Sequence, residues 1–388
     1  MKTLSISTLL IHETENRERF DGLINPAIAR TSTIAFPNLE AFYEEEKHGF
    51  SDKSYGRSGT STVKSLAHMI AKLDGVDDAI ITGCGLSAIT TALISFLNSG
   101  DSVLIPDNVY ICTRRFFKDI LSKFGIKAIY YPIGTGNEIE DLIEANTKIL
   151  FLESPGSGTF EIQDIPKLTA IAKKNDLITI LDNTWATPLN FQPFKHGIDV
   201  TVMSLSKYIN GHSDVLLGSI TSKPEYFSKI HNTFKNYAPI PSPDDCYLAL
   251  RGIRTLDCRL KLQSANSIKI ASWLEQQNRV IKVNHPALSS FPTHHLWKRD
   301  FTGSSSTFSF FLRSSKESLF EFINNLQFFT IGLSWGGYES IILPLDLKRH
   351  RSMAKPEYRY NCVRVHVGLE DPDDLIMDLQ ENFKYLRE

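Results

Sequence analysis

The sequence predicts an α/β protein, built on a mostly parallel sheet flanked by helices and completed by a smaller α+β unit. Between about residue 60 and residue 245, helix-like segments alternate with short apolar runs. These runs are almost continuously apolar, which is typical of parallel strands that are buried on both faces. Strands are expected at residues 79–82, 102–105, 128–131, 149–152, 178–181 and 200–203.

The residues after this sheet predict a second unit. A long helix is expected over residues 248–277, followed by strands at 307–312 and 363–367. Near the end, Asp371 and Pro372 are typical of a helix N-cap and first turn, and the apolar residues that follow recur on one helical face. A chain of 388 residues also exceeds the length at which a single core keeps growing, so two domains are expected.

The first part of the chain has the pattern of an arm rather than a domain. Its one clear periodic stretch is a helical segment at residues 39–47. We expect such an arm to pack on a neighbouring subunit. The predicted organisation is an arm over residues 1–58, a large domain over 59–247 and a small C-terminal domain over 248–388.

Composition excludes several classes of function. The net charge is -2 with mixed signs throughout, which gives no basic stripe for nucleic acid. The 5 cysteines are dispersed and form no Cys-x-x-Cys pair, so neither a disulfide framework nor a metal site is expected. No run is long enough to cross a membrane, and the N-terminus lacks a signal-peptide cleavage pattern. A reducing cytoplasm is the expected location.

Lys207 is the first candidate for chemistry, because it follows an expected strand and stands among small hydroxyl residues. A lysine is by default a solvated surface charge, so the interpretation depends on its partners. A lysine that forms an imine with pyridoxal phosphate needs three more features in the same chain: an acid for the pyridinium nitrogen, a ring-stacking face and a phosphate cradle.

Asp182 meets the demand for an acid. It directly follows the expected strand at 178–181, and ligands of parallel α/β sheets collect at the carboxyl ends of strands. A carboxylate there can pair with a protonated ring nitrogen. The alternative is an ordinary aspartate that caps a helix or forms a turn.

Residues 83–88, Gly-Cys-Gly-Leu-Ser-Ala, predict a phosphate cradle, because they follow a strand and begin an apolar helix. Ser204 and Ser206 beside the candidate lysine would add two hydroxyl donors. The same letters match the dinucleotide fingerprint G-x-G-x-x-A with Asp107 as a ribose partner, as in an NAD-dependent dehydrogenase. A plain tight turn is a third alternative.

Tyr110 and Arg364 complete the candidate site. Tyr110 follows the strand at 102–105 and offers a stacking face, or it is simply a half-buried tyrosine. Arg364 alternates with Val363 and Val365, so its guanidinium lies on the opposite strand face from the valines. There it can clamp a carboxylate through two hydrogen bonds, although a polar sheet face would give the same pattern.

Taken together, these residues occur in an order that resembles the fold-type I pyridoxal-phosphate enzymes of cysteine and methionine metabolism. The resemblance implies the aspartate aminotransferase type of fold and extends almost from end to end. The matching motifs are residues 55–60, 151–157, 181–185, 206–214, 251–255 and 334–340.

The resemblance implies a role for each matching residue. Lys207 would form the imine and carry protons, Asp182 would hold the pyridinium nitrogen, and Tyr110 would stack on the ring. Arg364 would bind the substrate α-carboxylate. The main-chain amides of Gly85 and Leu86 with Ser204 and Ser206 would hold the phosphate, Asn183, Ser334 and Trp335 would contact substrate, and Tyr55 and Arg57 would reach the phosphate of a neighbouring subunit.

Within this family, residues 297–304 and Trp335 resemble the bacterial-type cystathionine β-lyases, which form homocysteine, pyruvate and ammonia from cystathionine in methionine biosynthesis. Cystine and other cysteine S-conjugates are further expected substrates, and a homodimer or a dimer of dimers is the expected assembly. The alternative within the family is a γ-lyase or γ-synthase. Cys112, Ser206 and Leu333 depart from the family pattern, and Leu333 and Cys112 leave the preference among these substrates open.

Overall fold

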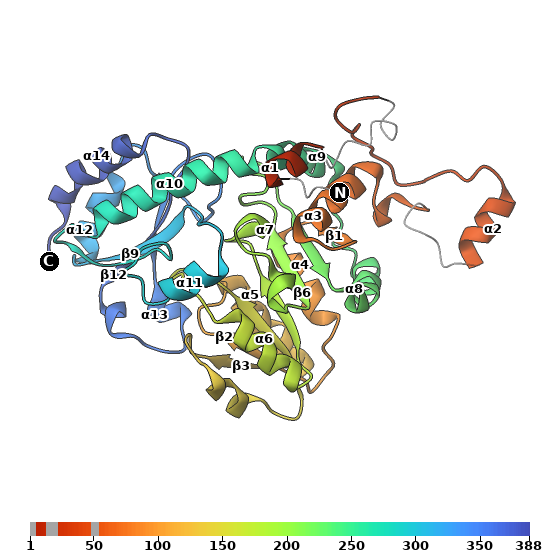
Figure 1. The fold of residues 1–388 in the computed structure, drawn as a ribbon, viewed down its shortest axis with the longest axis horizontal. Coiled ribbons are helices and arrows are strands. Elements are labelled where there is room, and N and C mark those ends of the chain that lie inside the picture. Colours follow the sequence, from red (N-terminus) through yellow and green to blue (C-terminus); the bar gives the residue numbers. More distant parts are fainter. Residues whose placement is uncertain (1–4, 13–21, 48–53) are drawn as a thin grey trace.

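The computed structural model describes residues 5–12, 22–47 and 54–388, and its two sheets define the architecture (Figure 1). The larger sheet has seven strands in the order β1-β7-β6-β5-β4-β2-β3. The strands are β1 (Ala79–Thr82), β2 (Ser102–Pro106), β3 (Lys127–Tyr131), β4 (Thr147–Glu153), β5 (Ile178–Asp182), β6 (Val200–Ser204) and β7 (Gly218–Ser222).

The prediction of a mostly parallel sheet is confirmed. Strands β2 to β6 pair in parallel, and all six apolar runs form strands close to their expected bounds. Strand β7 was not expected, and it pairs antiparallel with both β6 and β1. Its sequence, Gly-Ser-Ile-Thr-Ser, contains a single large apolar residue, so it lacks the signal that identified the other strands.

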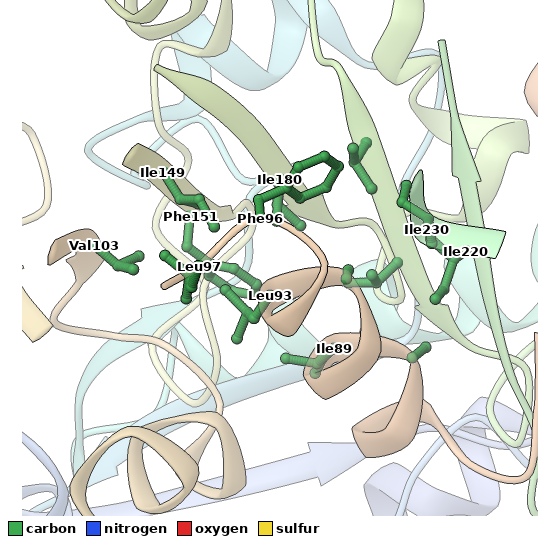
Figure 2. Close-up of a cluster of buried hydrophobic side chains, with 14 of the residues drawn as sticks. Ile89, Leu93, Phe96, Leu97, Val103, Ile149, Phe151, Ile180, Ile220 and Ile230 are labelled. Atoms are coloured by element: carbon green, nitrogen blue, oxygen red, sulfur yellow. The ribbon is translucent and has the colours of Figure 1, made fainter. Parts of the chain in front are cut away.

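Both faces of this sheet are buried, as alternate residues of β4 demonstrate. Ile149 and Phe151 belong to the core on the side of α4 (Gly85–Ile94), whereas Leu150 and Leu152 belong to the core on the side of α6 (Ile165–Lys174). Figure 2 shows the first of these cores, where side chains of α4 face those of the central strands. The apolar pattern of these strands is therefore explained by burial on both faces of the sheet, as the sequence indicated.

The remaining helices cover the sheets, connect them or form the N-terminal region. They are α1 (Ile6–His12), α2 (Leu39–Lys47), α3 (Ser61–Asp74), α5 (Ile111–Asp119), α7 (Thr187–Asn190), α8 (Pro224–Tyr237), α9 (Pro243–Arg254), α10 (Leu256–Leu274), α11 (His294–Asp300), α12 (Lys316–Asn324), α13 (Leu347–His350) and α14 (Pro372–Asn382), with short 3₁₀ helices at η2 (Gly56–Ser58), η3 (Leu121–Phe124), η4 (Asn137–Leu142), η5 (Pro193–His196), η6 (Pro356–Arg359) and η7 (Phe383–Tyr385).

The second unit contains a five-stranded sheet in the order β10-β11-β12-β9-β8. Its core contains valines of β12 and apolar residues of α14, whose N-cap is Asp371 as predicted. Arg364 lies on the strand face opposite those valines. The strands are β8 (Val280–Asn284), β9 (Thr307–Leu312), β10 (Thr330–Ile331), β11 (Ile341–Leu345) and β12 (Asn361–His366).

The prediction of one helix over 248–277 is wrong in detail, because two helices, α9 and α10, occupy this region. They meet at Thr255, whose backbone leaves the helical range at φ -101 and ψ 5. The Gly252 carbonyl accepts hydrogen bonds from Thr255 N and from the Arg259 guanidinium instead of continuing the helical pattern. The predicted domain boundary at residue 247 falls inside α9, which packs on α3 of the large domain.

The N-terminal region combines an unexpected helix with a confirmed one. Helix α1 was not predicted, and it buries Leu10 in the core that α3 and α9 share. Helix α2 has the predicted bounds and has no buried residue. In Figure 1 it lies well apart from the body of the subunit, on the right-hand side. This placement fits an arm, although part of the predicted 1–58 arm lies outside the described residues.

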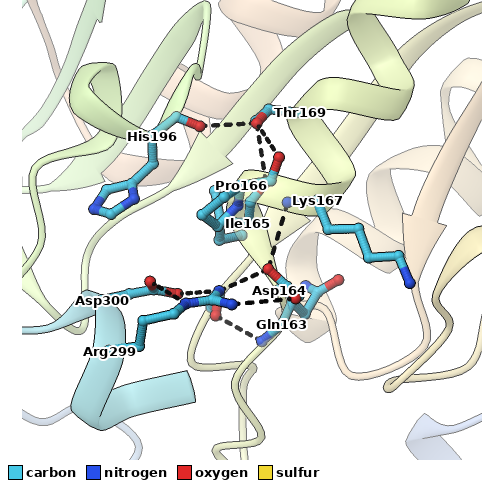
Figure 3. A network of polar contacts seen from close by, with 10 residues as sticks. Gln163, Asp164, Ile165, Pro166, Lys167, Thr169, His196, Arg299 and Asp300 are labelled. Atoms are coloured by element: carbon cyan, nitrogen blue, oxygen red, sulfur yellow. Dashed lines mark hydrogen bonds and ion pairs between the residues drawn. The ribbon is translucent and has the colours of Figure 1, made fainter. Parts of the chain in front are cut away.

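An ion-pair network joins α11 to the large domain, as Figure 3 shows. Arg299 donates to Asp300 and also to Asp164, at 2.7 Å and 2.6 Å. Asp164 in turn caps α6 by accepting from Lys167 N. Since the domains meet around the carboxyl edge of the large sheet, contacts of this kind fix the relative position of the site residues that each domain contributes.

No helix in the described part of the chain is both long enough and apolar enough to span a membrane.

Asp74 makes stability depend on pH. It is buried at the end of α3, where Thr221 Oγ1 donates to one carboxyl oxygen at 2.7 Å and the other oxygen has no partner. Burial raises its pKa from 3.8 to about 7, against the opposing effect of hydrogen bonds from Thr221 and Thr201. Because the folded pKa lies above the unfolded one, this residue costs increasing stability as pH rises from 3.8 to about 7.

We expect Asp74→Asn to relieve that cost. Relative to wild type, its free energy of unfolding should increase by on the order of 4 kcal/mol as the pH rises from about 4 to about 8. Urea titrations across this range measure the difference. A constant gap between the two proteins would show that Asp74 does not titrate in this way.

Candidate active site

A cavity of about 290 Å³ lies at the carboxyl ends of β4, β5 and β6, where parallel α/β sheets bind ligands. The large domain supplies most of its wall, and the small domain supplies Leu333, Trp335 and Arg364. Most of the residues that the sequence predicted therefore meet in one place. Those that line the cavity are Gly85, Leu86, Tyr110, Asp182, Ser204, Ser206, Lys207, Trp335 and Arg364.

The main chain around Lys207 is held by Arg259 and Gly336, which both belong to the C-terminal part of the chain. Arg259 is buried, and its guanidinium donates to the carbonyl of Tyr208 at 2.9 Å as well as to Gly252. From the small domain, Gly336 adopts φ +88, and a Cβ there would lie 2.9 Å from Tyr208 N and 3.0 Å from the Lys207 main chain. This close approach holds the lysine in a defined position at the cavity wall.

The Lys207 side chain is half-buried at the cavity wall. Its Nζ donates to Ser334 Oγ at 2.7 Å and lies 5.5 Å from the centre of the Trp335 ring. Burial lowers the Lys207 pKa to about 8, and the Arg364 cation contributes to the decrease. An amine with this pKa is partly neutral at physiological pH, as a nucleophile or base requires.

Asp182 ends β5 and is held by Thr184. The Thr184 main-chain N and hydroxyl both donate to Oδ1, at 3.0 Å and 2.5 Å, while Ser204 N donates to the same hydroxyl. Burial raises the Asp182 pKa, against the hydrogen bonds from Thr184 and the charge of Lys207. A carboxylate buried at this position favours a cationic partner in the cavity.

Helix α4 begins at the cavity wall, with Cys84 as its N-cap. Main-chain N–H groups of a first helical turn have no acceptor within the helix, so Gly85 and Leu86 offer donors to an anion. A Cβ on Gly85 would lie 2.6 Å from Ser204 Cβ, which explains why glycine occupies this position. The Ser206 hydroxyl already donates to the Leu217 carbonyl at 3.2 Å, so Ser204 is the freer of the two predicted hydroxyls.

Tyr110 is the N-cap of α5, and its side chain is 39% exposed. Its main-chain N donates to Glu153 Oε2 at 2.7 Å. Burial raises the Tyr110 pKa, with a smaller contribution from Cys112, so the phenol stays protonated. Glu153 itself lines the cavity but was not among the predicted site residues. Glu153 directly follows the strand expected at residues 149–152, and this position was the signal that could have identified it.

Arg364 secures the small-domain side of the cavity. Its Nη2 donates to the carbonyls of Leu333 and Ser334, at 2.7 Å and 3.2 Å. Burial lowers the Arg364 pKa to about 10. The Leu333 side chain is 85% exposed, although its carbonyl is bound. Buried His366 accepts from Ser306 Oγ and donates Nε2–H to the Gly337 carbonyl at 3.1 Å, which anchors the end of this loop.

Three predicted residues lie elsewhere in this subunit. Asn183 is buried, does not line the cavity, and donates to the Phe191 carbonyl at 3.2 Å. Tyr55 and Arg57 line a separate hollow together with aromatic residues of the N-terminal region. Within one subunit, therefore, the structure does not bring these two residues to Lys207.

Comparisons with known proteins identify the family. The sequence profile described as Cys/Met metabolism PLP-dependent enzyme matches residues 7–384. The chain is also 35% identical to the cystathionine β-lyase of Escherichia coli over 99% of each protein. The chain belongs to this family. The Cys/Met family is dependent on pyridoxal phosphate, so the dinucleotide interpretation of residues 83–88 is not supported.

Two further similar proteins show the range of activities that are named near this chain. The L-alanine/L-glutamate racemase of Wolbachia pipientis is 40% identical over 93% of this chain and 92% of that protein. A crystal structure of cystathionine γ-synthase from Xanthomonas oryzae, in complex with aminoacrylate and cysteine, superposes with a TM-score of 0.90. That structure is 28% identical and covers 99% of both chains.

The residues around the cavity fit pyridoxal phosphate. A partly neutral amine, a buried carboxylate and a helix N-terminus are the three groups that the imine, the pyridinium nitrogen and the phosphate require. The close approach of Gly85 to Ser204 leaves a main-chain surface where an anion can reach amide donors. The donor set therefore agrees with the family.

The pKa of Lys207 gives a direct test on the apoenzyme. Imine formation with added pyridoxal phosphate should accelerate as pH rises through about 8, because only the neutral amine reacts. Arg364→Met should move this midpoint upward, since it removes a cation that lowers the Lys207 pKa. Arg364→Lys retains the charge and should leave the midpoint nearer to that of wild type. Stopped-flow absorbance measures all three proteins, and equal midpoints would contradict the assigned electrostatic coupling.

Proposed function

We propose that this enzyme is a carbon–sulfur β-lyase that converts cystathionine and water to homocysteine, pyruvate and ammonia. The observation that carries the proposal is the pairing of the Lys207 amine with Ser334 and Trp335 across the domain junction, in a cavity that also contains Arg364. In this arrangement, a base (Lys207) and a cation that can bind a carboxylate (Arg364) can contact the same small substrate. The cystathionine β-lyase relative supports the same activity.

The proposed coenzyme contacts follow from the polar groups of the wall. Lys207 would attach the coenzyme, Asp182 would bind the ring nitrogen, and Tyr110 would cover the ring. The amides of Gly85 and Leu86, with the Ser204 and Ser206 hydroxyls, would hold the phosphate. When bound in this way, pyridoxal phosphate serves as an electron sink for a carbanion at the substrate α-carbon.

Proton movements are assigned to Lys207 and Tyr110. The Lys207 amine removes the α-proton, because its lowered pKa leaves part of it neutral. The C–S bond then breaks, and the sulfur takes a proton from Lys207 or from the Tyr110 phenol, whose raised pKa keeps it protonated. Water completes the release of pyruvate and ammonia. Arg364 binds the α-carboxylate, and Ser334, Trp335 and Asn183 are the further proposed substrate-side residues.

We also propose that the active unit is at least a dimer. Tyr55 and Arg57 lie on the arm side of the subunit, away from its own Lys207, and Tyr55 is 46% exposed. In a dimer, these two residues would supply a hydroxyl donor and a cation to the coenzyme phosphate of the neighbouring subunit. A pair of such dimers would form the expected tetramer.

Lys207→Ala tests the catalytic assignment. We expect it to lower pyruvate release from cystathionine by roughly 1000-fold or more, because both the attachment point and the base are lost. Lys148→Ala, at an exposed position of β4, is the control and should retain wild-type activity. Borohydride reduction of the wild-type holoenzyme should fix the coenzyme on the peptide that contains Lys207. A label on another lysine would overturn the assignment.

The same assay separates β-cleavage from γ-chemistry, for which the Xanthomonas neighbour is the structural precedent. β-Cleavage of cystathionine yields pyruvate and homocysteine. γ-Cleavage yields α-ketobutyrate and cysteine. A dehydrogenase assay specific for each keto acid distinguishes the two reactions, and α-ketobutyrate as the main product would replace β-lyase by γ-lyase.

Racemisation is a second candidate, because the Wolbachia relative carries the name of an alanine and glutamate racemase. Removal and return of the same α-proton would use Lys207 and Tyr110 and needs no leaving group. We expect L-alanine incubated with the enzyme in deuterium oxide to incorporate deuterium at its α-carbon. Formation of D-alanine, measured by chiral chromatography, would establish racemisation, and exchange without D-alanine would limit the enzyme to proton abstraction.

A further inference from the structure

Glu153 is a cavity residue for which the reaction above has no role. It ends β4, and its register partner on the adjacent strand is Asp182. Among the described residues that line the cavity, these two are the carboxyl groups. Two buried carboxyl groups on neighbouring strands would repel each other if both were ionised. The coenzyme ring needs one of them as a partner for its nitrogen, so the other requires a separate explanation.

The contacts of Glu153 lead to Tyr110. Glu153 Oε2 accepts from Tyr110 N at 2.7 Å, and the carboxyl group also accepts from the Ser157 main chain. The Tyr110 side chain makes no capping hydrogen bond to α5, the residue is 39% exposed, and the phenol has Cys112 as its side-chain partner. The backbone that carries the ring is held at the start of the helix by Glu153, which accepts from Tyr110 N.

The charged neighbours of Glu153 favour its neutral form. Burial is the largest effect and raises the Glu153 pKa well above its ordinary value, and the Asp182 carboxylate raises it further. Arg351 and the main-chain donors at Tyr110 and Ser157 oppose this shift without cancelling it. A protonated carboxyl group still has a carbonyl oxygen that accepts from an amide.

We propose that Glu153 is a positioning residue that orients the Tyr110 ring through its main-chain N–H, and that it does so as an uncharged acceptor beside the Asp182 carboxylate. The inference rests on the proposed coenzyme roles of Tyr110 and Asp182. As a consequence, the carboxyl groups of Glu153 and Asp182, at two adjacent strand ends, have different roles. One carboxyl group provides negative charge to the ring nitrogen, and the other provides geometry to the ring face.

Two substitutions separate geometry from charge. Glu153→Gln retains an oxygen acceptor of the same length and is neutral at every pH, whereas Glu153→Ala removes the acceptor. Asp199→Ala is the matched control for general destabilisation. Asp199 is also buried and accepts from a main-chain amide, Thr179 N at 2.9 Å, but it lies before β6, at the opposite end of that strand from the cavity.

Three readouts are measured for each protein. Hydrogen exchange of the peptide that contains Tyr110, followed by mass spectrometry in the apoenzyme, reports the Glu153–Tyr110 contact directly. Visible circular dichroism reports the orientation of bound pyridoxal phosphate, and a titration gives its Kd. The pH profile of kcat/KM reports the ionisation of the site.

We expect Glu153→Ala to lose protection at Tyr110, to change the dichroism band and to weaken coenzyme binding by about 10-fold, equivalent to loss of one well-placed hydrogen bond. Glu153→Gln should match wild type within about 2-fold in affinity and have an unchanged pH profile. Asp199→Ala should lower the unfolding temperature without altering the dichroism band. If Glu153→Ala fails to fold, Glu153→Asp, which withdraws the acceptor by one methylene, replaces it.

Unchanged exchange and dichroism in Glu153→Ala would overturn the positioning role. A defect in Glu153→Gln as large as that in Glu153→Ala, or a shifted pH profile, would show that the ionised carboxylate is needed and would overturn the uncharged role. Failure of the proposed function is seen separately, because wild type itself would then bind no coenzyme at Lys207. The exchange measurement on the apoenzyme remains valid in that case.

Discussion

The contact between the Lys207 amine and Ser334 is the interaction on which the site depends, because it requires both domains to be in place. No carboxylate among the described residues forms an ion pair with the amine, and the attraction of Asp182 offsets only part of the effect of burial. What holds it is the surrounding main chain. The Gly336 main chain packs against the turn at Lys207, and the Arg259 guanidinium donates to the Tyr208 carbonyl of the same turn. The position of this lysine is therefore a product of domain packing.

Much of the fold could be predicted because burial on both faces leaves a strong trace in sequence. Six strands of the large sheet have near-continuous apolar runs, and alternate residues of β4 contribute to two different cores. Strand β7 has no such apolar run. Small and hydroxyl residues occupy most of this strand, which lies between two antiparallel neighbours. The break at Thr255 was also invisible, because it depends on Arg259 binding the Gly252 carbonyl, a contact that no local pattern encodes.

Site residues could be predicted where a charged residue directly follows an expected strand or stands close to its end. Asp182 and Lys207 follow apolar runs, and the carboxyl edge of a parallel sheet brings such residues together. Asn183 follows Asp182 by one position, and the alternation of an extended chain turns it toward the protein interior instead. Glu153 has the same sequence signal as Asp182 but was read only as part of a motif. What distinguishes Asp182, Asn183 and Glu153 is their exposure and hydrogen bonding. These are properties of the folded chain and cannot be seen in the sequence.

Leu333 illustrates how such a site can change. Its carbonyl is tied to Arg364, so its backbone position is fixed, while its side chain is 85% exposed and makes little contribution to packing. Replacement of an exposed side chain on a fixed backbone has a small effect on the free energy of unfolding. A substitution of Leu333 can therefore alter the chemistry of the cavity mouth at little cost in stability. A different side chain at this position would reshape the cavity mouth and leave the residues around Lys207 in place.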